Sequence, residues 1–317
     1  MLIRVLGSAA GGGFPQWNCA CSNCAGVRAG TLVSKPRSQA QLAVSPNGGE
    51  WFLLGASPDL RTQLEAASPL LPSHQQSADN RLSPIAGVVL LSAELDHTVG
   101  LFTLRERHPL RIYATPSVRK LVADENSFFR MLEREPGQSQ WENLQAGDRV
   151  KLRNARGKEI GIVCTPVSVG EKFPFFAFAG DDRDKRADLQ PDEAVLGLLL
   201  DDATGRKVFY APGLGEVTPG LMNMFRACDV LLLDGSFWSN NELVSAAGKG
   251  QTAREMGHLP LGGLDGLLHA LAGVDGPRKI LIHINNTNPI LDEVSDEYRQ
   301  VRTAGWEIAE DGWVIQI

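Results

Sequence analysis

The chain has 317 residues, of which 43% are hydrophobic and 21% charged, and its formal net charge is −6. This composition is ordinary for a globular protein, and the length is sufficient to bury a large core. The negative charge disfavours nucleic acid or an anionic membrane as a partner, and no apolar run approaches the roughly 20 residues that a membrane-spanning helix needs.

Residues 2–6 predict a first strand, which runs into a glycine loop at residues 7–13. Because no basic segment followed by an apolar stretch precedes the strand, we expect no signal peptide and a cytoplasmic location. The glycine loop has neither the Gly-Lys-Ser/Thr ending of a Walker loop nor G-x-G-x-x-G spacing. Its small residues favour close approach of the backbone to a ligand or to a neighbouring strand.

Three cysteines follow within six residues, at Cys19, Cys21 and Cys24. In a reducing compartment such a cluster favours a metal ion over disulfides. Thiolates hold zinc at about 2.3 Å in a closed tetrahedron, so the motif predicts a structural zinc site. The fourth ligand is a histidine, an asparagine carbonyl or a water, because Cys164 and Cys228 lie in apolar stretches typical of core thiols. Unpaired surface thiols and a catalytic redox pair are the alternatives, although no thioredoxin-like pattern surrounds the motif.

The middle and the end of the chain alternate predicted strands and helices. Alternation and apolar runs predict strands at residues 38–45, 51–55, 88–91, 111–114, 150–152, 160–163, 195–200, 207–210, 230–233 and 279–282. Helices are expected at residues 101–107, 117–133 and 261–272, and a terminal hairpin is expected from residues 307–309 and 313–317. There is no internal repeat, so we predict a single domain over residues 1–317.

Residues 169–193 are too long for a plain connection between strands. The segment carries four phenylalanines, at Phe173, Phe175, Phe176 and Phe178, followed by a charged run. Loops of this length are often lids or binding loops, or else disordered, and we interpret this one as a lid.

Polar residues follow three of the predicted buried strands. Asp96 and His97 come after residues 88–91, Asp234 after residues 230–233 and His283 after residues 279–282, and His258 precedes a predicted helix. In α/β proteins the chemistry is usually placed beyond the carboxyl ends of strands. Two histidines and one carboxylate suit a non-haem Fe(II) centre that activates oxygen, whereas the same ligands also suit zinc that activates water. The alternative without a metal ion is that Asp96 caps a helix and His97 packs in the core.

The order of these motifs resembles the metallo-β-lactamase fold, whose signature is H-x-H-x-D-H. The chain has S-x-E-x-D-H at residues 92–97, A-P-G-L-G at 211–215, M-G-H-L at 256–259 and I-H-I-N-N-T-N-P at 282–289. Together with G-S-A-A-G-G-G-F-P-Q-W-N-C at residues 7–19, these motifs resemble the coenzyme PQQ synthesis protein B family over nearly the whole chain. The resemblance implies an α/β fold, an αββα sandwich of four layers.

The departures from the signature concern one of its two metal sites. Ser92 and Glu94 stand where the signature has its first two histidines, and Pro212-Gly213-Leu214 stands where hydrolytic relatives have an acid. Two-metal hydrolysis needs both ions about 3.5–4 Å apart. We therefore expect no hydrolase activity of the two-metal kind.

The family resemblance implies an iron-dependent oxygenase that uses O2 to hydroxylate the tyrosine ring of a peptide-derived precursor of pyrroloquinoline quinone (PQQ). In this interpretation Asp96, His97 and His283 hold Fe(II). Glu94, Asp234 and His258 lie near the pocket, where Glu94 or Asp234 orients ligands or assists proton transfer. Relatives with the same cysteine motif have a histidine at the position of Asn286, so Asn286 or a water is expected as the fourth zinc ligand.

Two other functions compete with the oxygenase. One is a carrier or transport protein for PQQ or its precursor, on a degraded metallo-hydrolase scaffold. The other is a mononuclear zinc hydrolase. The oligomeric state is left open between a monomer and a homodimer.

Overall fold

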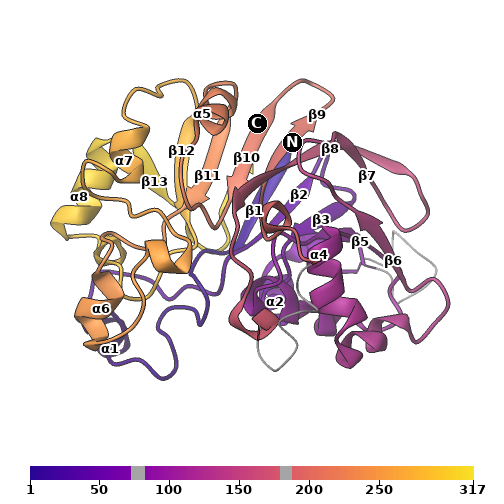
Figure 1. Ribbon diagram of the computed structural model, residues 1–317, viewed down its shortest axis with the longest axis horizontal. Helices are drawn as coiled ribbons and strands as arrows, with labels where there is room; N and C mark the ends of the chain where they lie inside the picture. Colours follow the sequence, from indigo (N-terminus) through magenta and orange to yellow (C-terminus); the bar gives the residue numbers. More distant parts are fainter. Residues whose placement is uncertain (73–82, 179–187) are drawn as a thin grey trace. The chain divides into compact units, whose positions relative to one another are not determined.

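Figure 1 shows the computed structural model of the protein, which describes residues 1–72, 83–178 and 188–317. The chain divides into two compact units, each assembled from separate stretches of sequence. Unit 1 comprises Met1–Leu6, Gln41–Gly205 and Gly312–Ile317, and unit 2 comprises Gly7–Ala40 and Arg206–Asp311. That residues 1–317 form a single domain stays a prediction.

The first sheet lies in unit 1 and has the strand order β14-β1-β2-β3-β4-β5-β6. Strands β2 and β3, which correspond to the strands predicted at residues 38–45 and 51–55, are antiparallel, whereas β3 to β6 are parallel. Parallel strands are usually buried on both faces, as β4 is along its whole length. The strands are β1 (Leu2–Gly7), β2 (Gln41–Ser45), β3 (Trp51–Leu54), β4 (Ile85–Val89), β5 (Leu110–Ala114), β6 (Ser139–Asn143) and β14 (Val314–Gln316).

Short helices cover this sheet and complete its core (Figure 1). Leu60 and Val118 from the helices pack with Leu53, Val88 and Ile112 from the strands. The helical segments are α2 (Leu60–Ala66), η1 (Ser68–Leu70), α3 (Leu95–Thr98), η2 (Val99–Leu104), α4 (Pro116–Arg119), η3 (Lys120–Asp124) and η4 (Ser127–Glu133).

Two of the predicted helices differ from the observed ones. The helix expected at residues 101–107 is the 3-10 helix η2, and the one expected at residues 117–133 is divided into α4, η3 and η4. Asn126 causes the second break, because its side chain accepts a hydrogen bond from the Phe128 N–H and so starts a new helical segment.

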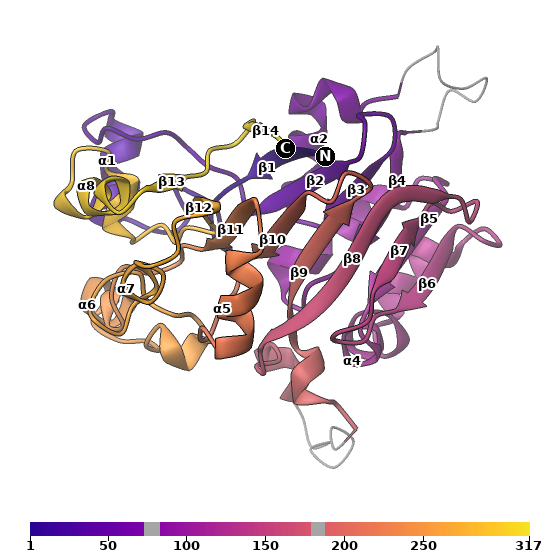
Figure 2. The same cartoon turned by 90° about the horizontal axis from the view of Figure 1, so that it is seen from above.

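Unit 1 also contains an antiparallel group of three strands: β7 (Val150–Arg153), β8 (Glu159–Gly170) and β9 (Val195–Asp202). Figure 2 shows β8 as a long curved strand between the other two. Two 3-10 helices, η5 (Phe175–Phe178) and η7 (Pro191–Glu193), lie in the connection from β8 to β9, and residues 179–187 of the predicted lid lie outside the described residues.

In unit 2 the strands β10 (Lys207–Ala211), β11 (Val230–Asp234), β12 (Arg278–Ile282) and β13 (Trp306–Ile308) are parallel neighbours. In Figure 2 they run side by side, with α5, α6 and α7 on one side of them. The helical segments of this unit are α1 (Ser22–Ala29), α5 (Pro219–Arg226), α6 (Glu242–Ala247), η8 (Arg254–Met256), α7 (Leu267–Ala270), η9 (Pro289–Leu291) and α8 (Asp296–Thr303).

The helix predicted at residues 261–272 is reduced to α7. Three glycines, at Gly262, Gly263 and Gly266, disfavour a helix at its start. A Cβ on Gly266 would lie 2.2 Å from the Gly262 carbonyl oxygen, so this close turn also requires glycine.

The prediction of a terminal hairpin from residues 307–309 and 313–317 is wrong. The two segments do not pair with each other: β13 joins β12, and β14 joins β1. The residues between them are held by side chains instead of forming a tight turn. Arg37 donates to the Ala309 carbonyl, and the Asp311 carboxylate accepts 2.7 Å hydrogen bonds from Ser8 and Ser38.

Among the described residues, no helix combines the length and the apolar character required to cross a membrane.

Candidate functional site

The ends of β11 and β12 bring Asp234 and His283 together in unit 2. The two strands are parallel neighbours, with Asp234 opposite Ile282, so the residue that follows Ile282 lies at the same edge as the acid. Asp234 is 1% exposed and His283 is 6% exposed. The prediction that these strand ends meet is therefore confirmed for this pair.

A hydrogen-bond network joins the Asp234 carboxylate to both histidines of this unit. One oxygen of Asp234 accepts from His258 Nδ1 at 2.6 Å, and the other accepts from Ser236 Oγ at 2.6 Å. The same Ser236 oxygen lies 2.8 Å from His283 Nδ1. The rings of His258 and His283 are stacked, with centroids 5.5 Å apart and an interplanar angle of 20°.

The hydrogen bonds of this network indicate which nitrogen of each imidazole carries a proton. The only hydroxyl proton of Ser236 goes to the charged Asp234 oxygen, because a short charge-assisted bond is stronger than a bond to a neutral acceptor. Ser236 Oγ must therefore accept from His283 Nδ1–H, and Asp234 accepts from His258 Nδ1–H in the same way. In its neutral form each imidazole then has its lone pair on Nε2, the atom that binds a metal ion or accepts a proton.

The environment of Asp234 keeps it ionised. Burial alone would raise the pKa of this carboxyl, but attraction to and hydrogen bonds from His258 and His283 outweigh burial and hold the pKa well below its usual range. Backbone N–H groups of Leu214 and Ser236 also donate to it, at 3.2 and 3.0 Å. Asp234, His258 and His283 have ligand atoms close enough to hold a metal ion themselves, but both carboxylate oxygens already accept hydrogen bonds, which favours an orienting role for Asp234.

The other predicted ligands lie in unit 1, at the start of α3. Glu94 precedes this helix and is exposed, Asp96 lies in its first turn and His97 is 6% exposed. Ser92 Oγ lies 2.8 Å from His97 Nδ1. Ser92, which stands where the signature has its first histidine, therefore contacts the last histidine of the signature. Because Asp96 and His97 belong to unit 1 and His283 to unit 2, their convergence on one ion stays a prediction.

The three cysteines gather at the start of α1. The sulfur atoms of Cys19, Cys21 and Cys24 all lie within 4.8 Å of one another. The side-chain amide of Asn286 lies over them, with Nδ2 at 3.2, 3.6 and 3.4 Å from the sulfurs of Cys19, Cys21 and Cys24. Rotation of this amide by 180° exchanges its nitrogen and oxygen and would point Oδ1 at the same place. Three sulfurs and one oxygen then form a four-ligand set, which fits a closed structural zinc site.

The pKa values of the thiols in this cluster, and of the thiol of Cys164, depend on their surroundings. Burial by itself raises the pKa of the Cys19 thiol, yet hydrogen bonds from Cys21, Cys24 and Asn286 bring that pKa below its ordinary value. Burial raises the pKa of Cys21 to about 11. Cys164 and Cys228 are buried, as predicted for core thiols, and burial raises the pKa of Cys164 to about 12.

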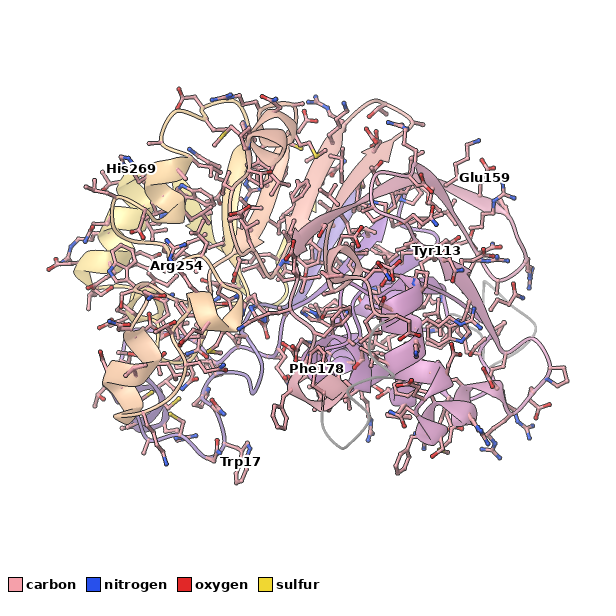
Figure 3. The ribbon with its side chains drawn as sticks, in the orientation of Figure 1. Trp17, Tyr113, Glu159, Phe178, Arg254 and His269 are labelled. Carbon is pink, nitrogen blue, oxygen red and sulfur yellow. The ribbon has the colours of Figure 1, made fainter. Side chains whose placement is uncertain are left out.

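Three functional residues were missed by the sequence reasoning. Ser236, two residues after Asp234, and Ser92 both contact a histidine, and Asn23 holds the backbone of the Asn286 segment. Ser236 and Asn23 stand beside predicted ligands in the sequence, and Ser92 was noted only as a replacement for a histidine of the signature. Two other histidines lie apart from the networks described above: His269 is exposed on α7 (Figure 3), and buried His108 is bonded through Nε2 to the Ile85 carbonyl at 2.7 Å.

A family model described as a beta-lactamase superfamily domain matches residues 50–284. The coenzyme PQQ synthesis protein B of Pseudomonas putida is 42% identical over 318 residues, covering 100% of both chains. The chain belongs to the coenzyme PQQ synthesis protein B family. The family member from Azotobacter vinelandii is likewise 42% identical over 318 residues and 100% of both chains.

A solved structure from the coenzyme PQQ synthesis protein B family supports the fold. Zinc-bound PqqB from Methylobacterium extorquens has a TM-score of 0.87 and 34% identity, with 100% of both chains covered. The predicted metallo-β-lactamase fold, with mixed β-sheets flanked by helices, is therefore confirmed. That relative binds zinc.

Proposed function

We propose that this protein acts in the cytoplasm in PQQ biosynthesis, as an iron-dependent oxygenase that hydroxylates the tyrosine ring of a peptide-derived PQQ precursor. The names of full-length relatives at 42% identity support the pathway. The ligand types and their orientation support the reaction.

The observation that carries the proposal is the pairing of each ligand histidine with a serine. Ser92 contacts Nδ1 of His97, and Ser236 contacts Nδ1 of His283, both at 2.8 Å. This arrangement favours metal binding through Nε2 in each case. At position 92 the serine also removes a ligand that two-metal hydrolysis would need. We propose that Asp96, His97 and His283 are the ligands of one Fe(II), a set of two histidines and one carboxylate that leaves positions for substrates.

When bound, Fe(II) would supply the activation of dioxygen, of which one atom would enter the ring while the other would leave as water with two electrons from an external reductant. The residues around it supply orientation and proton transfer. Ionised Asp234 fixes Ser236 and thereby the ring of His283. Through its second oxygen it also fixes His258, whose Nε2 lone pair can accept the proton lost from the aromatic ring. Glu94 is exposed beside the ligands of unit 1, where it can assist proton transfer.

Exposed phenylalanines support an aromatic substrate. Phe175, Phe176 and Phe178 are 88%, 38% and 51% exposed, whereas Phe173 packs against the core of unit 1. Aromatic rings prefer to pack against other rings in offset or edge-to-face geometry. We propose that these three rings cover the tyrosine ring of the precursor and exclude water from it.

The cysteine cluster has a separate, structural role in this proposal. Cys19, Cys21, Cys24 and the Asn286 amide hold a zinc ion that ties the start of α1 to the segment after β12.

Anaerobic reconstitution with Fe(II), followed by oxygen and a tyrosine-containing precursor peptide, tests the function. A product heavier by oxygen, formed only when Fe(II) and O2 are both present, supports the oxygenase. Binding of PQQ or the precursor without turnover would instead indicate a carrier, and addition of water in the presence of zinc would indicate a hydrolase.

Histidine variants link the reaction to the site. His283→Ala and His97→Ala should lose iron and product formation while remaining folded. His269→Ala is the matched control, because this exposed histidine lies apart from the network of Asp234 (Figure 3) and its loss should leave turnover unchanged.

A further inference from the structure

Residues 283–288 carry groups that face both candidate metal sites of unit 2. His283 begins the segment, and Asn286 lies three residues later over the cysteine sulfurs. Three residues of extended chain span at most about 10 Å, so the two sites are connected by a very short piece of backbone.

His283 has an unusual backbone conformation. Its φ angle is +61°, in the left-handed region that non-glycine residues seldom adopt. Such a conformation persists only when the surrounding structure imposes it. The orientation of the His283 ring therefore depends on what holds the segment on both sides.

On the side of β12, the strand edge holds His283. Ser236 Oγ contacts the His283 ring, at 2.8 Å from Nδ1. The next residue, Ile284, donates to the Ser8 carbonyl at 3.0 Å and accepts from the Ala10 N–H at 2.9 Å. These contacts do not involve the cysteines.

On the other side, the start of α1 holds the segment. Asn23 donates to the carbonyls of Asn286 and Asn288, at 3.1 and 2.9 Å, and Cys21 Sγ lies 3.7 Å from the Asn286 carbonyl oxygen. Asn23 lies between Cys21 and Cys24 in the sequence. The three thiols and the Asn23 side chain that holds the backbone of the segment thus all come from residues 19–24.

Glu242 provides a brace that is independent of any metal ion. Its carboxylate accepts from Thr287 Oγ1 at 2.6 Å, and Thr287 Oγ1 accepts from Asn285 Nδ2 at 2.6 Å. This brace keeps residues 283–288 partly ordered when no metal ion is bound to the thiols. It therefore limits how much metal binding at the thiols can strengthen metal binding at His283.

We propose that metal binding at the thiol cluster tightens metal binding at His283. A metal ion held by Cys19, Cys21 and Cys24 fixes the Asn286 amide, and the fixed segment keeps His283 in its left-handed, metal-ready conformation. The proposal rests on His283 being a metal ligand, as in the proposed function. Since coupling between two sites is reciprocal, occupation of the His283 site equally tightens the thiol site.

Binding of Mn²⁺ to the full-length protein tests this coupling, because Mn²⁺ prefers nitrogen and oxygen ligands to thiolates. Its dissociation constant is measured by electron paramagnetic resonance with the thiol cluster either loaded with one equivalent of zinc or emptied by a chelator. We expect binding about tenfold weaker with the cluster empty, within the usual range of coupling between sites. Equal dissociation constants in the two states would overturn the proposal.

Two variants separate the coupling from general loss of folding. Asn286→Ala retains the three thiols but removes the link, so it should weaken Mn²⁺ binding and abolish its dependence on zinc. Cys228→Ser, at a buried thiol that donates to the Met224 carbonyl, is the matched control and should behave as the wild type.

The His283→Ala variant distinguishes failure of the coupling proposal from failure of the proposed iron site. If it abolishes Mn²⁺ binding while zinc has no effect in the wild type, the coupling is refuted and the proposed iron site stands. If Mn²⁺ binds this variant as tightly as the wild type, the proposed iron site is refuted and the coupling with it.

Discussion

Asp234→Asn should weaken metal binding at His283, because it disrupts the hydrogen bonds that orient Ser236 and both histidines of unit 2. The wild-type carboxylate accepts on both oxygens, from His258 at 2.6 Å and from Ser236 at 2.6 Å. An asparagine amide accepts on one side only, because its other end is an NH2 donor.

Either orientation of the new amide replaces one acceptor of this network by a donor. If NH2 faces Ser236, the serine accepts from the amide and turns its own proton to His283, either to the carbonyl oxygen or to Nδ1, and in the second case the ring proton moves to Nε2. If NH2 faces His258, two donors meet and His258 changes its tautomer instead. In both cases the amide also meets a backbone N–H, of Ser236 or Leu214, that now lacks an acceptor.

The expected loss follows from the general effect of residues that orient metal ligands. Changing such a partner typically lowers metal affinity about 10- to 100-fold. This corresponds to roughly 1.4 to 2.8 kcal/mol of binding free energy.

Competition with a chelator of known affinity measures the loss, and ¹⁵N spectra of the imidazoles report the tautomers directly. Asp265→Asn is the matched control, since Asp265 is an exposed acid that pairs with Arg254 and does not belong to the hydrogen-bond network of Asp234. Unchanged affinity together with an unchanged His283 tautomer in Asp234→Asn would refute the reasoning.

Three further predictions concern stability. Cys21→Ser should lower the melting temperature of the zinc-loaded protein and reduce its zinc content, and an unchanged melting curve would argue against a structural zinc site. Burial raises the pKa of partly buried Glu242 from 4.5 to about 7, so its protonated form is favoured in the folded state and stability should fall as the pH rises from about 4.5 to 7, by up to about 3 kcal/mol. Denaturant titrations at pH 5 and pH 8 should show that Glu242→Gln removes this fall, whereas an identical pH profile in the variant would contradict it. Gly100→Ala would place a Cβ 2.1 Å from the Ser57 carbonyl oxygen and should cost about 1–3 kcal/mol or more, while Gly273→Ala, with open space around it, should be nearly neutral in the same chemical denaturation assay.

The strands that position the site could be predicted because their sequences are unambiguous. The apolar runs that overlap β4, β11 and β12 are typical of strands buried on both faces of a sheet, although the run predicted at residues 88–91 extends two residues beyond the end of β4. The helices were harder. Both α5 and α8 were missed, although the side chains of Thr218 and Ser295 cap them by accepting from Leu221 and Tyr298 N–H groups.

The candidate site divides in the same way. Asp234 and His283 could be named because each follows a predicted buried strand, and His258 because it lies in one of the motifs that resemble the family. Ser236 could not, since a serine has no chemical signature until its hydroxyl is placed between a carboxylate and a ring. The left-handed φ of His283 was equally inaccessible, because it is imposed by contacts distant in sequence.

The distance in sequence between the cysteines and Asn286 has a consequence for how the protein is made. Cys19 and Asn286 are 267 positions apart, so the ribosome must add nearly the whole chain before the amide can cover the sulfurs. At about 5–20 residues per second, this takes on the order of tens of seconds. During that time the nascent thiols have no partner from the C-terminal part and are exposed to oxidants and to competing metals. On the proposed zinc site, loading of the cluster belongs to the last stage of synthesis, and we expect yields of zinc-loaded protein to depend on the redox state of the host during translation.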